Sequence, residues 1–224
     1  MKPSEPIDDP AIPDLLSLDR HTTYLAASGG DQARAVRLYA WNIEVSAAFW
    51  GGFNLLEVCL RNALHAQLTN FAGRSDWWNT PLRLSYEHRR KLDDAIRFVA
   101  ADKAESATDG HVVAELTLSF WTGLLANRYH SMLWEPALQY AFPHLNGRRG
   151  DIHADLERLR KLRNRIAHHE PVFARRLTDD HRRLLAVLDA IDPAAAAWLT
   201  DATRVPEVLG ARRATVDGER HAQF

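Results

Sequence analysis

Apolar residues recur at steps of three or four positions along most of this chain, which is the spacing of amphipathic helices. The pattern is clearest in the last third, at Ile152, Leu156, Leu159, Leu162 and Ile166. No segment alternates apolar and polar residues as a half-buried strand would. The spacing predicts an all-α fold, with helices over residues 12–27, 32–71, 85–102, 112–127, 130–142, 151–169, 179–191 and 193–200.

Glycine and proline mark the ends of these predicted helices. Gly51-Gly52 is a candidate break within the second helix, Asp151 resembles an N-cap, and Pro171 stops the helix that contains the residues listed above. We expect residues 1–13, which carry four prolines, to be a flexible segment. Residues 14–202 are expected to form a single helical domain, and residues 203–224, which lose apolar periodicity, a mobile tail.

The composition is that of an ordinary globular protein. Of the 224 residues, 46% are hydrophobic and 25% charged, and 28 Lys and Arg against 29 Asp and Glu give a net charge of -1. The single cysteine, Cys59, cannot form an internal disulfide. The N-terminus has no signal-peptide pattern, and the longest apolar run, residues 45–56, is short of the roughly 20 residues that span a membrane. We therefore expect a cytoplasmic protein that does not associate with membranes.

Basic residues are concentrated in one region of the chain. Between Arg148 and Arg183 there are eleven Lys or Arg against six Asp or Glu. Such a strip could bind an RNA backbone by releasing counterions, or it could be the solvated face of an amphipathic helix. The candidates for RNA binding are Arg160, Lys161, Arg165, Arg175 and Arg176.

Residues 163–170 (RNRIAHHE) combine a permanent cation, an amide and two imidazoles at the end of one predicted helix. Arginine can hold a phosphate through two parallel hydrogen bonds, and histidine exchanges protons near neutral pH. Asn164 and His168 are four residues apart and share a helix face, whereas Arg163 lies about 100° around the helix from Asn164. One such helix does not close a pocket, but a second copy across a two-fold axis would bring two Arg and two His into one groove.

The Arg-Asn-x-x-x-His pattern resembles the hallmark of the Abi-like (abortive infection) branch of the HEPN superfamily. Three other segments strengthen the resemblance. Leu18, Arg20 and Tyr24 resemble the opening helix of the family, residues 57–64 (EVCLRNAL) an early helix, and residues 119–124 (SFWTGL) a later one. The likeness extends from Leu15 to about Leu199, and the order of these segments makes it more specific than the short motif alone.

The resemblance implies an HEPN-like helical bundle with additional helices, and a metal-independent endoribonuclease formed at a homodimer interface. Such a protein would be an effector or toxin of phage defence, with RNA as substrate and an antitoxin protein or noncoding RNA as a further partner. Arg163 and His168 would be the catalytic pair, with Asn164 orienting the imidazole or a phosphate oxygen. His169 and Glu170 would be supporting residues, and the products would carry 2′,3′-cyclic phosphate and 5′-hydroxyl ends.

Other interpretations of these residues remain open. The chain could be a noncatalytic RNA-binding or protein-interaction module, or Arg163 and His168 could only hold the helix end in place. Arg61 and Asn62 are candidate supporting residues behind the catalytic pair, although a Glu57–Arg61 ion pair would explain Arg61 without a site. Adjacent positions 168–170 do not share a helix face, so we expect neither a metal site nor a cofactor.

Aromatic residues are expected to be mainly core. This applies to Trp41, Phe49, Trp50 and Phe53 on the second predicted helix. Trp77 and Trp78 fall in a predicted loop, where they could stack on an RNA base, but capping of the core is the favoured interpretation.

Overall fold

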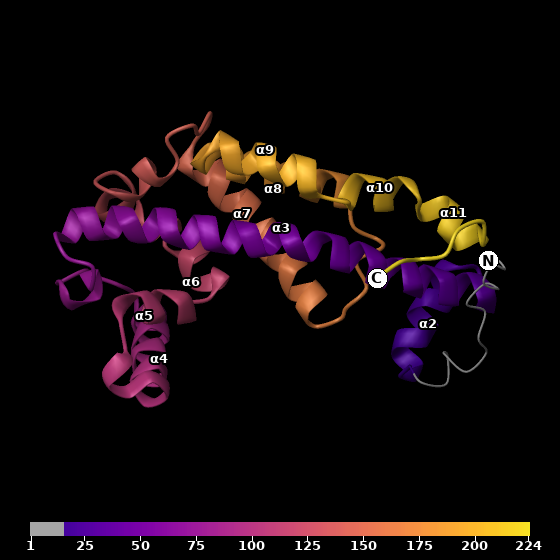
Figure 1. Cartoon of the computed structure of the whole chain (residues 1–224), viewed down its shortest axis with the longest axis horizontal. Helices are drawn as coiled ribbons and strands as arrows, with labels where there is room; N and C mark the ends of the chain where they lie inside the picture. Colours follow the sequence, from indigo (N-terminus) through magenta and orange to yellow (C-terminus); the bar gives the residue numbers. More distant parts are fainter. Residues whose placement is uncertain (1–15) are drawn as a thin grey trace. The chain divides into compact units, whose positions relative to one another are not determined.

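A computed structural model describes residues 16–224, and helices form most of that part of the chain, with no strand in it (Figure 1). The predicted all-α fold is thus confirmed. The proposed flexible segment, residues 1–13, lies outside the described residues. The helices are α2 (Leu18–Ala27), α3 (Gln32–Ala72), α4 (Tyr86–Lys103), α5 (Asp109–Glu115), α6 (Leu118–Gly123), α7 (Arg149–Ala167), α8 (Leu177–Ile191), α9 (Pro193–Ala202), α10 (Val205–Gly210) and α11 (Arg212–Asp217).

The described residues form two compact units, where the sequence predicted one domain over residues 14–202. The first unit comprises residues 16–52, 162–181 and 202–224, and the second comprises residues 53–161 and 182–201. Each unit is assembled from segments that are far apart in the sequence. Helices α3, α7 and α8 contribute residues to both units.

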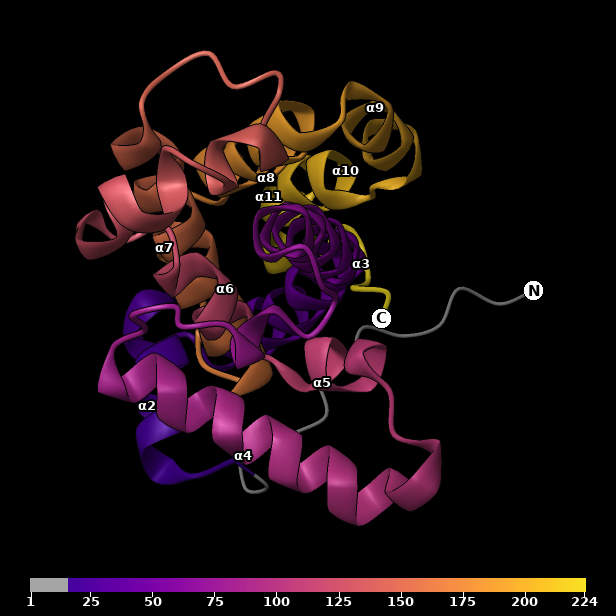
Figure 2. The same ribbon diagram turned by 90° about the vertical axis from the view of Figure 1, so that its left-hand side faces the viewer.

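In the first unit, α10 and α11 run beside the N-terminal part of α3 (Figures 1 and 2). The Trp41 indole donates to the carbonyl of Val208 at 2.9 Å, and Val205 and Val208 are fully buried. Residues 203–224 were expected to be a mobile tail, and they instead form two short packed helices. Each of these helices is only about two turns long, too short to produce a periodic pattern that the sequence alone would reveal.

The second unit is built around aromatic rings. Helix α4 packs against α5 and α6 (Figure 2). Trp77 lies in a short 3₁₀ turn (η1, Trp77–Asn79), is fully buried, and contacts the rings of Trp78, Phe120 and Trp121. The preferred interpretation of this tryptophan pair, as a cap on the core, is therefore the correct one.

Helix α3 is continuous through Gly51-Gly52, the candidate break in the sequence. Buried residues follow one another in steps of four on both sides of the glycines: Trp41, Val45 and Phe49 before them, and Leu56, Leu60, Leu64 and Leu68 after them. Packing of that stripe outweighs the roughly 1 kcal/mol that each glycine costs in a helix. By length and composition alone α3 could also cross a membrane, a test that core helices of soluble proteins pass too.

Two predicted helices are interrupted. The helix expected over residues 112–127 is divided at Leu116, whose ψ of 122° is extended, and the Trp121 indole donates to the freed Leu116 carbonyl at 3.1 Å. The helix expected over residues 130–142 is reduced to a π turn (η4, His130–Trp134) and a 3₁₀ turn (η5, Leu138–Ala141). Pro136 lies between these turns, and proline cannot donate the hydrogen bond that a continuous helix would need.

Candidate functional site

Helix α7 ends within the motif, in a specific backbone geometry. His169 adopts the left-handed conformation, with φ of 56°. The Glu170 amide donates to the Arg165 carbonyl at 2.8 Å and the His169 amide to the Ile166 carbonyl at 3.0 Å, which is the Schellman pattern of helix termination. Histidine tolerates the left-handed region better than most residues. His168 therefore occupies the C-cap position, immediately after the last helical residue, Ala167, and before the chain reverses.

The side chains of this helix end are open to solvent. His168, His169 and Glu170 are exposed, and Asn164 is half-buried on the preceding turn. The Asn164 carbonyl accepts the His168 amide at 2.9 Å, so the backbone of both residues is fixed in helical geometry. A ligand in solution can reach the His168 imidazole without any rearrangement of the helix.

Arg163 lies against Trp50 of α3, in the same unit. Its guanidinium carbon is 5.6 Å from the centre of the indole ring, within the range of a cation–π interaction. Trp50 is 45% exposed, so the assignment of this residue to the core was wrong, whereas Trp41, Phe49 and Phe53 are buried as predicted. Trp50 lies one residue beyond the stripe of buried residues that passes through Phe49, which turns it about 100° away from the core.

The loop that follows the motif is held by three side chains from other parts of the first unit. Arg20 of α2 donates to the His169 carbonyl at 2.6 Å. The buried Asn42 of α3 accepts the amides of Val172 and Phe173 at 2.7 and 3.2 Å, and Arg212 of α11 donates to the Phe173 carbonyl at 2.9 Å. The backbone on the C-terminal side of His168 is consequently anchored by α2, α3 and α11.

Helix α2 also packs on this loop through its aromatic residue. The buried Tyr24 ring lies 5.1 Å from that of Phe173 and 5.2 Å from that of Tyr39, and burial raises the pKa of its phenol. Two of the three residues that define the family-like opening helix, Arg20 and Tyr24, thus contact the segment that follows the motif. The third, Leu18, is 79% exposed.

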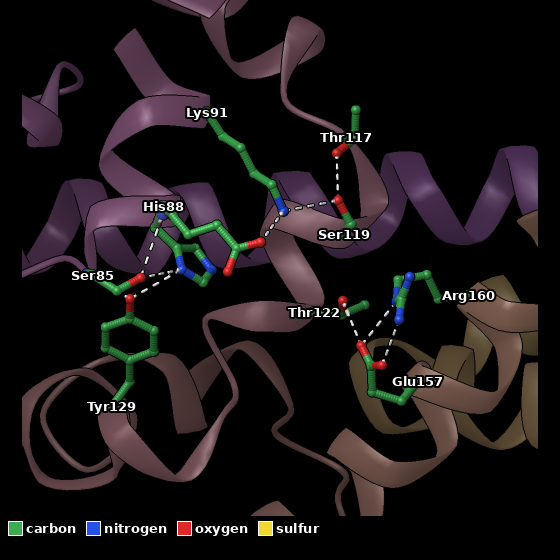
Figure 3. Close-up of polar contacts among 10 residues, drawn as sticks. Ser85, His88, Lys91, Thr117, Ser119, Thr122, Tyr129, Glu157 and Arg160 are labelled. Atoms are coloured by element: carbon green, nitrogen blue, oxygen red, sulfur yellow. Dashed lines mark hydrogen bonds and ion pairs between the residues drawn. The ribbon is translucent and has the colours of Figure 1, made fainter. Parts of the chain in front are cut away.

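Acidic residues compensate much of the basic strip. Arg160 makes two hydrogen bonds to Glu157, at 3.0 and 2.8 Å, and Thr122 donates to the same carboxylate (Figure 3). The Arg160 hydrogen bonds lower the pKa of Glu157. Arg165 and Arg175 form further ion pairs, with Glu170 at 3.1 Å and Asp180 at 3.0 Å, whereas Lys161 and Arg176 are exposed.

Arg61 and Asn62, the candidate supporting residues, lie on the part of α3 that belongs to the second unit. Arg61 is half-buried and Asn62 is exposed. Their contribution to a catalytic site stays a prediction.

A second polar cluster, which the sequence did not single out, surrounds His88 in the second unit (Figure 3). The Nδ1 atom of His88 lies 3.0 Å from Ser85 Oγ and 3.1 Å from the Tyr129 hydroxyl. Ser85 Oγ also accepts the His88 amide as the N-cap of α4, and Tyr129 accepts the Ser85 amide. Burial lowers the pKa of His88, and the residue is 7% exposed. Because these hydroxyls fix the start of α4 and the imidazole is closed off from solvent, the cluster is structural.

In residues 16–224, no group of three or more His, Cys, Asp and Glu side chains is arranged to hold a metal ion. Cys59 is half-buried, and burial raises the pKa of its thiol, which disfavours the reactive thiolate.

Comparison of the chain with protein-family models, with curated proteins and with solved structures finds no match. The likeness to the HEPN superfamily therefore depends on the residues of this chain alone.

Proposed function

We propose that this protein is a metal-independent endoribonuclease of the HEPN type, an Abi-like effector or toxin of phage defence that acts on RNA in the cytoplasm. The observation that carries the proposal is the end of α7, where an exposed imidazole, His168, follows an arginine and an asparagine on a helix terminus anchored by α2, α3 and α11. This arrangement presents a proton carrier and a phosphate-binding cation in a fixed backbone frame.

The chemistry that suits these groups is transfer of a phosphodiester to its neighbouring 2′-hydroxyl. His168 takes the proton from the 2′-hydroxyl as the 2′-oxygen bonds to phosphorus. The bond between phosphorus and the 5′-oxygen then breaks, and that oxygen takes up a proton from a second acid. Arg163 stabilises the negative charge that develops on the phosphoryl oxygens, and Asn164 orients the imidazole or a phosphate oxygen. The products are a 2′,3′-cyclic phosphate and a 5′-hydroxyl.

Dimerisation would supply the second acid. One α7 contributes a single Arg163 and a single His168, so a two-fold related copy would add the imidazole that protonates the leaving oxygen. His169, also exposed, is the alternative donor within the same chain. Glu170 pairs with Arg165 and so helps to fix the helix end rather than taking part in proton transfer.

The anchored loop after His168 favours a catalytic role over RNA binding alone. Hydrogen bonds donated by Arg20 and Arg212 and accepted by Asn42 hold the backbone after His168. A catalytic group contributes most when its position is fixed before the substrate binds. The toxin would require restraint in an uninfected cell, by an antitoxin protein or a noncoding RNA.

The second candidate is a noncatalytic RNA-binding or protein-interaction module. The loss of net positive charge from the basic strip favours this candidate, because Arg160, Arg165 and Arg175 each pair with an acidic side chain. RNA binding that is unchanged by His168→Ala, without cleavage, would select this alternative.

The deciding experiment is incubation of the purified dimer with total RNA in EDTA, followed by chemical mapping of the product ends. His168→Ala should lower the cleavage rate by about 10²- to 10⁴-fold, and Arg163→Ala by about 10²- to 10³-fold. His144→Ala is the matched control, since His144 is exposed in the second unit. Circular dichroism establishes that each variant is folded. Intact RNA from several classes, after exposure to a folded dimer, would refute the proposal.

A further inference from the structure

A cavity of about 370 Å³ lies between helices of the first unit, and none of the proposed catalytic residues lines it. Its walls come from the end of α2, the N-terminal part of α3, α10 and α11 (Figure 1). Segments from both ends of the described chain therefore enclose it. The volume falls at the lower end of the range for small-molecule sites.

Positive charge dominates the polar part of this cavity. Arg34, Arg212 and Arg213 line it together with one acidic residue, Asp217. The Asp217 carboxylate lies 2.7 Å from Arg34 and 3.5 Å from Arg213, so one negative charge is shared between two guanidinium groups. Three permanent positive charges against one negative charge leave a local excess of two.

Arg212 makes its contacts with uncharged groups. Its guanidinium donates to the Phe173 carbonyl at 2.9 Å, and the guanidinium carbon lies 4.8 Å from the centre of the Trp41 indole ring. Within residues 16–224, no carboxylate forms an ion pair with it. A guanidinium has five N–H donors, and the Phe173 carbonyl occupies one of them. An anion can therefore bind Arg212 without breaking its contact with the loop.

The uncharged part of the cavity includes three aliphatic residues, Leu38, Leu209 and Val216. We propose that the cavity binds a small phosphate monoester, with the phosphate on the arginines and a compact apolar body against these three residues. A phosphate monoester carries a charge of about -1.5 to -2 near pH 7, which matches the local excess. Arginine also binds phosphate oxygens through two parallel hydrogen bonds.

The same features favour a small molecule over an RNA strand. Each phosphodiester of RNA carries a single negative charge, and the ribose that flanks it is polar. Such a backbone matches neither the charge excess nor the aliphatic residues of this cavity. A monoester with an apolar body matches both.

Arg212 connects the cavity to the loop that follows His168. A ligand that holds the Arg212 guanidinium restricts its motion, and this should strengthen the hydrogen bond to the Phe173 carbonyl. Occupancy of the cavity should therefore stabilise the loop. An accompanying change in RNA cleavage would make the cavity a regulatory site, and only that last step rests on the proposed ribonuclease function.

Calorimetric titration of the full chain with phenyl phosphate, at fixed salt and without RNA, tests the site. Arg212→Gln should weaken binding by about 10- to 150-fold, and the exposed Arg213→Gln by about 2- to 5-fold. Asp217→Asn should strengthen binding by about 2- to 5-fold, because it removes the carboxylate that competes for two guanidinium groups. Misfolding cannot account for a gain in affinity.

Three comparisons complete the test. Inorganic phosphate should bind more weakly than phenyl phosphate, because it lacks the apolar body, and phenol should not bind. Arg176→Gln is the matched control, since Arg176 is an exposed arginine of the same unit that does not line the cavity. Phenyl phosphate should also slow amide hydrogen exchange over residues 172–175 in the wild type, but not in Arg212→Gln.

The outcomes separate this site from the proposed function. Absence of phenyl phosphate binding up to about 10 mM, or equal affinities in the Arg213→Gln and Asp217→Asn variants, would overturn the site whether or not the protein cleaves RNA. In the His168→Ala background, displacement of phenyl phosphate by a 5′-phosphorylated RNA, but not by the same RNA with a 5′-hydroxyl, would overturn the assignment to a small molecule. Binding as expected in a protein that cleaves no RNA would support the site and count against the ribonuclease.

Discussion

Arg220 closes a buried ion pair that connects the last residues of the chain to α3. Its guanidinium donates to the two carboxylate oxygens of Glu44 at 2.8 and 2.6 Å, and also to the Thr215 hydroxyl at 3.1 Å. The Glu44 side chain is 0% exposed and that of Arg220 is 23% exposed. A carboxylate removed from water in this way depends on its partner to remain stable.

Arg220→Ala should therefore be strongly destabilising. Removing one member of a buried pair typically costs about 3–5 kcal/mol. We expect the lower end, about 3 kcal/mol, because Arg204 lies 3.7 Å from the same carboxylate and water can enter the space that Arg220 leaves. For a chain of this size, each kcal/mol of lost stability lowers Tm by about 2–4 °C, so we expect Tm to fall by about 6–12 °C.

Thermal and urea unfolding, followed by circular dichroism, measure this loss. Glu44→Met combined with Arg220→Met should be far less destabilising, because no charge then remains buried without a partner. Arg213→Ala is the control, since Arg213 pairs with Asp217 at 3.5 Å through a side chain that is 94% exposed, and it should change stability by less than about 0.5 kcal/mol. A loss below about 1 kcal/mol in Arg220→Ala, or equal losses in the single and double variants, would refute the reasoning.

Three further predictions address other parts of the structure. A Cβ on Gly123 would lie 2.5 Å from His88 Nε2, so Gly123→Ala should lose about 1–3 kcal/mol in urea unfolding. A Cβ on Gly51 would have no neighbouring atom within 4 Å, so Gly51→Ala should instead raise the free energy of unfolding by up to about 1 kcal/mol. Similar effects of the two changes would contradict this reasoning. His169 has a positive φ of 56°, which glycine adopts freely, so His169→Gly should keep both stability and RNA cleavage. His169→Val should lower the free energy of unfolding by about 1–2 kcal/mol. Failure of the glycine variant to cleave would make His169 the proton carrier. Burial lowers the pKa of His181, so the unfolded chain binds the proton first as pH falls through about 6.5, and stability decreases from there towards the folded pKa. Urea titrations from pH 7.5 to 5 should show a smaller decrease for His181→Leu, and equal slopes would show that His181 does not contribute.

Helix positions were predictable where one periodic run coincides with one helix. Helix α4 matches the prediction closely, with Ser85 as the N-cap that accepts the His88 amide. Gly51-Gly52 misled the prediction because the propensity of glycine is a local penalty, whereas the packing that overrides it extends over most of α3. The short helices α10 and α11 were missed because two turns contain too few apolar positions to define a period.

The sequence predicted that the candidate residues lie at a helix end, as they do in the structure, but the contacts around them were not predictable. Asn42 and Arg212 act on the loop after His168 through backbone atoms, from positions 130 and 39 residues away from Val172 and Phe173 respectively. No local pattern reveals such contacts. Trp50 could have been recognised, because the buried stripe advances in strict steps of four through Phe49 and leaves the next residue on another face.

The way in which polar groups are used at the end of α7 argues against a purely structural role for the His168 side chain. A helix terminus that exists only for stability would satisfy its backbone groups and bury or pair the side chains that do so. Here the Schellman hydrogen bonds, Arg20 and Asn42 already satisfy backbone groups of residues 165–173, and Glu170 compensates Arg165. The imidazole of His168 is exposed on that frame, where it adds little to stability. His168→Ala should therefore reduce RNA cleavage without lowering Tm, whereas a structural role requires both to fall together.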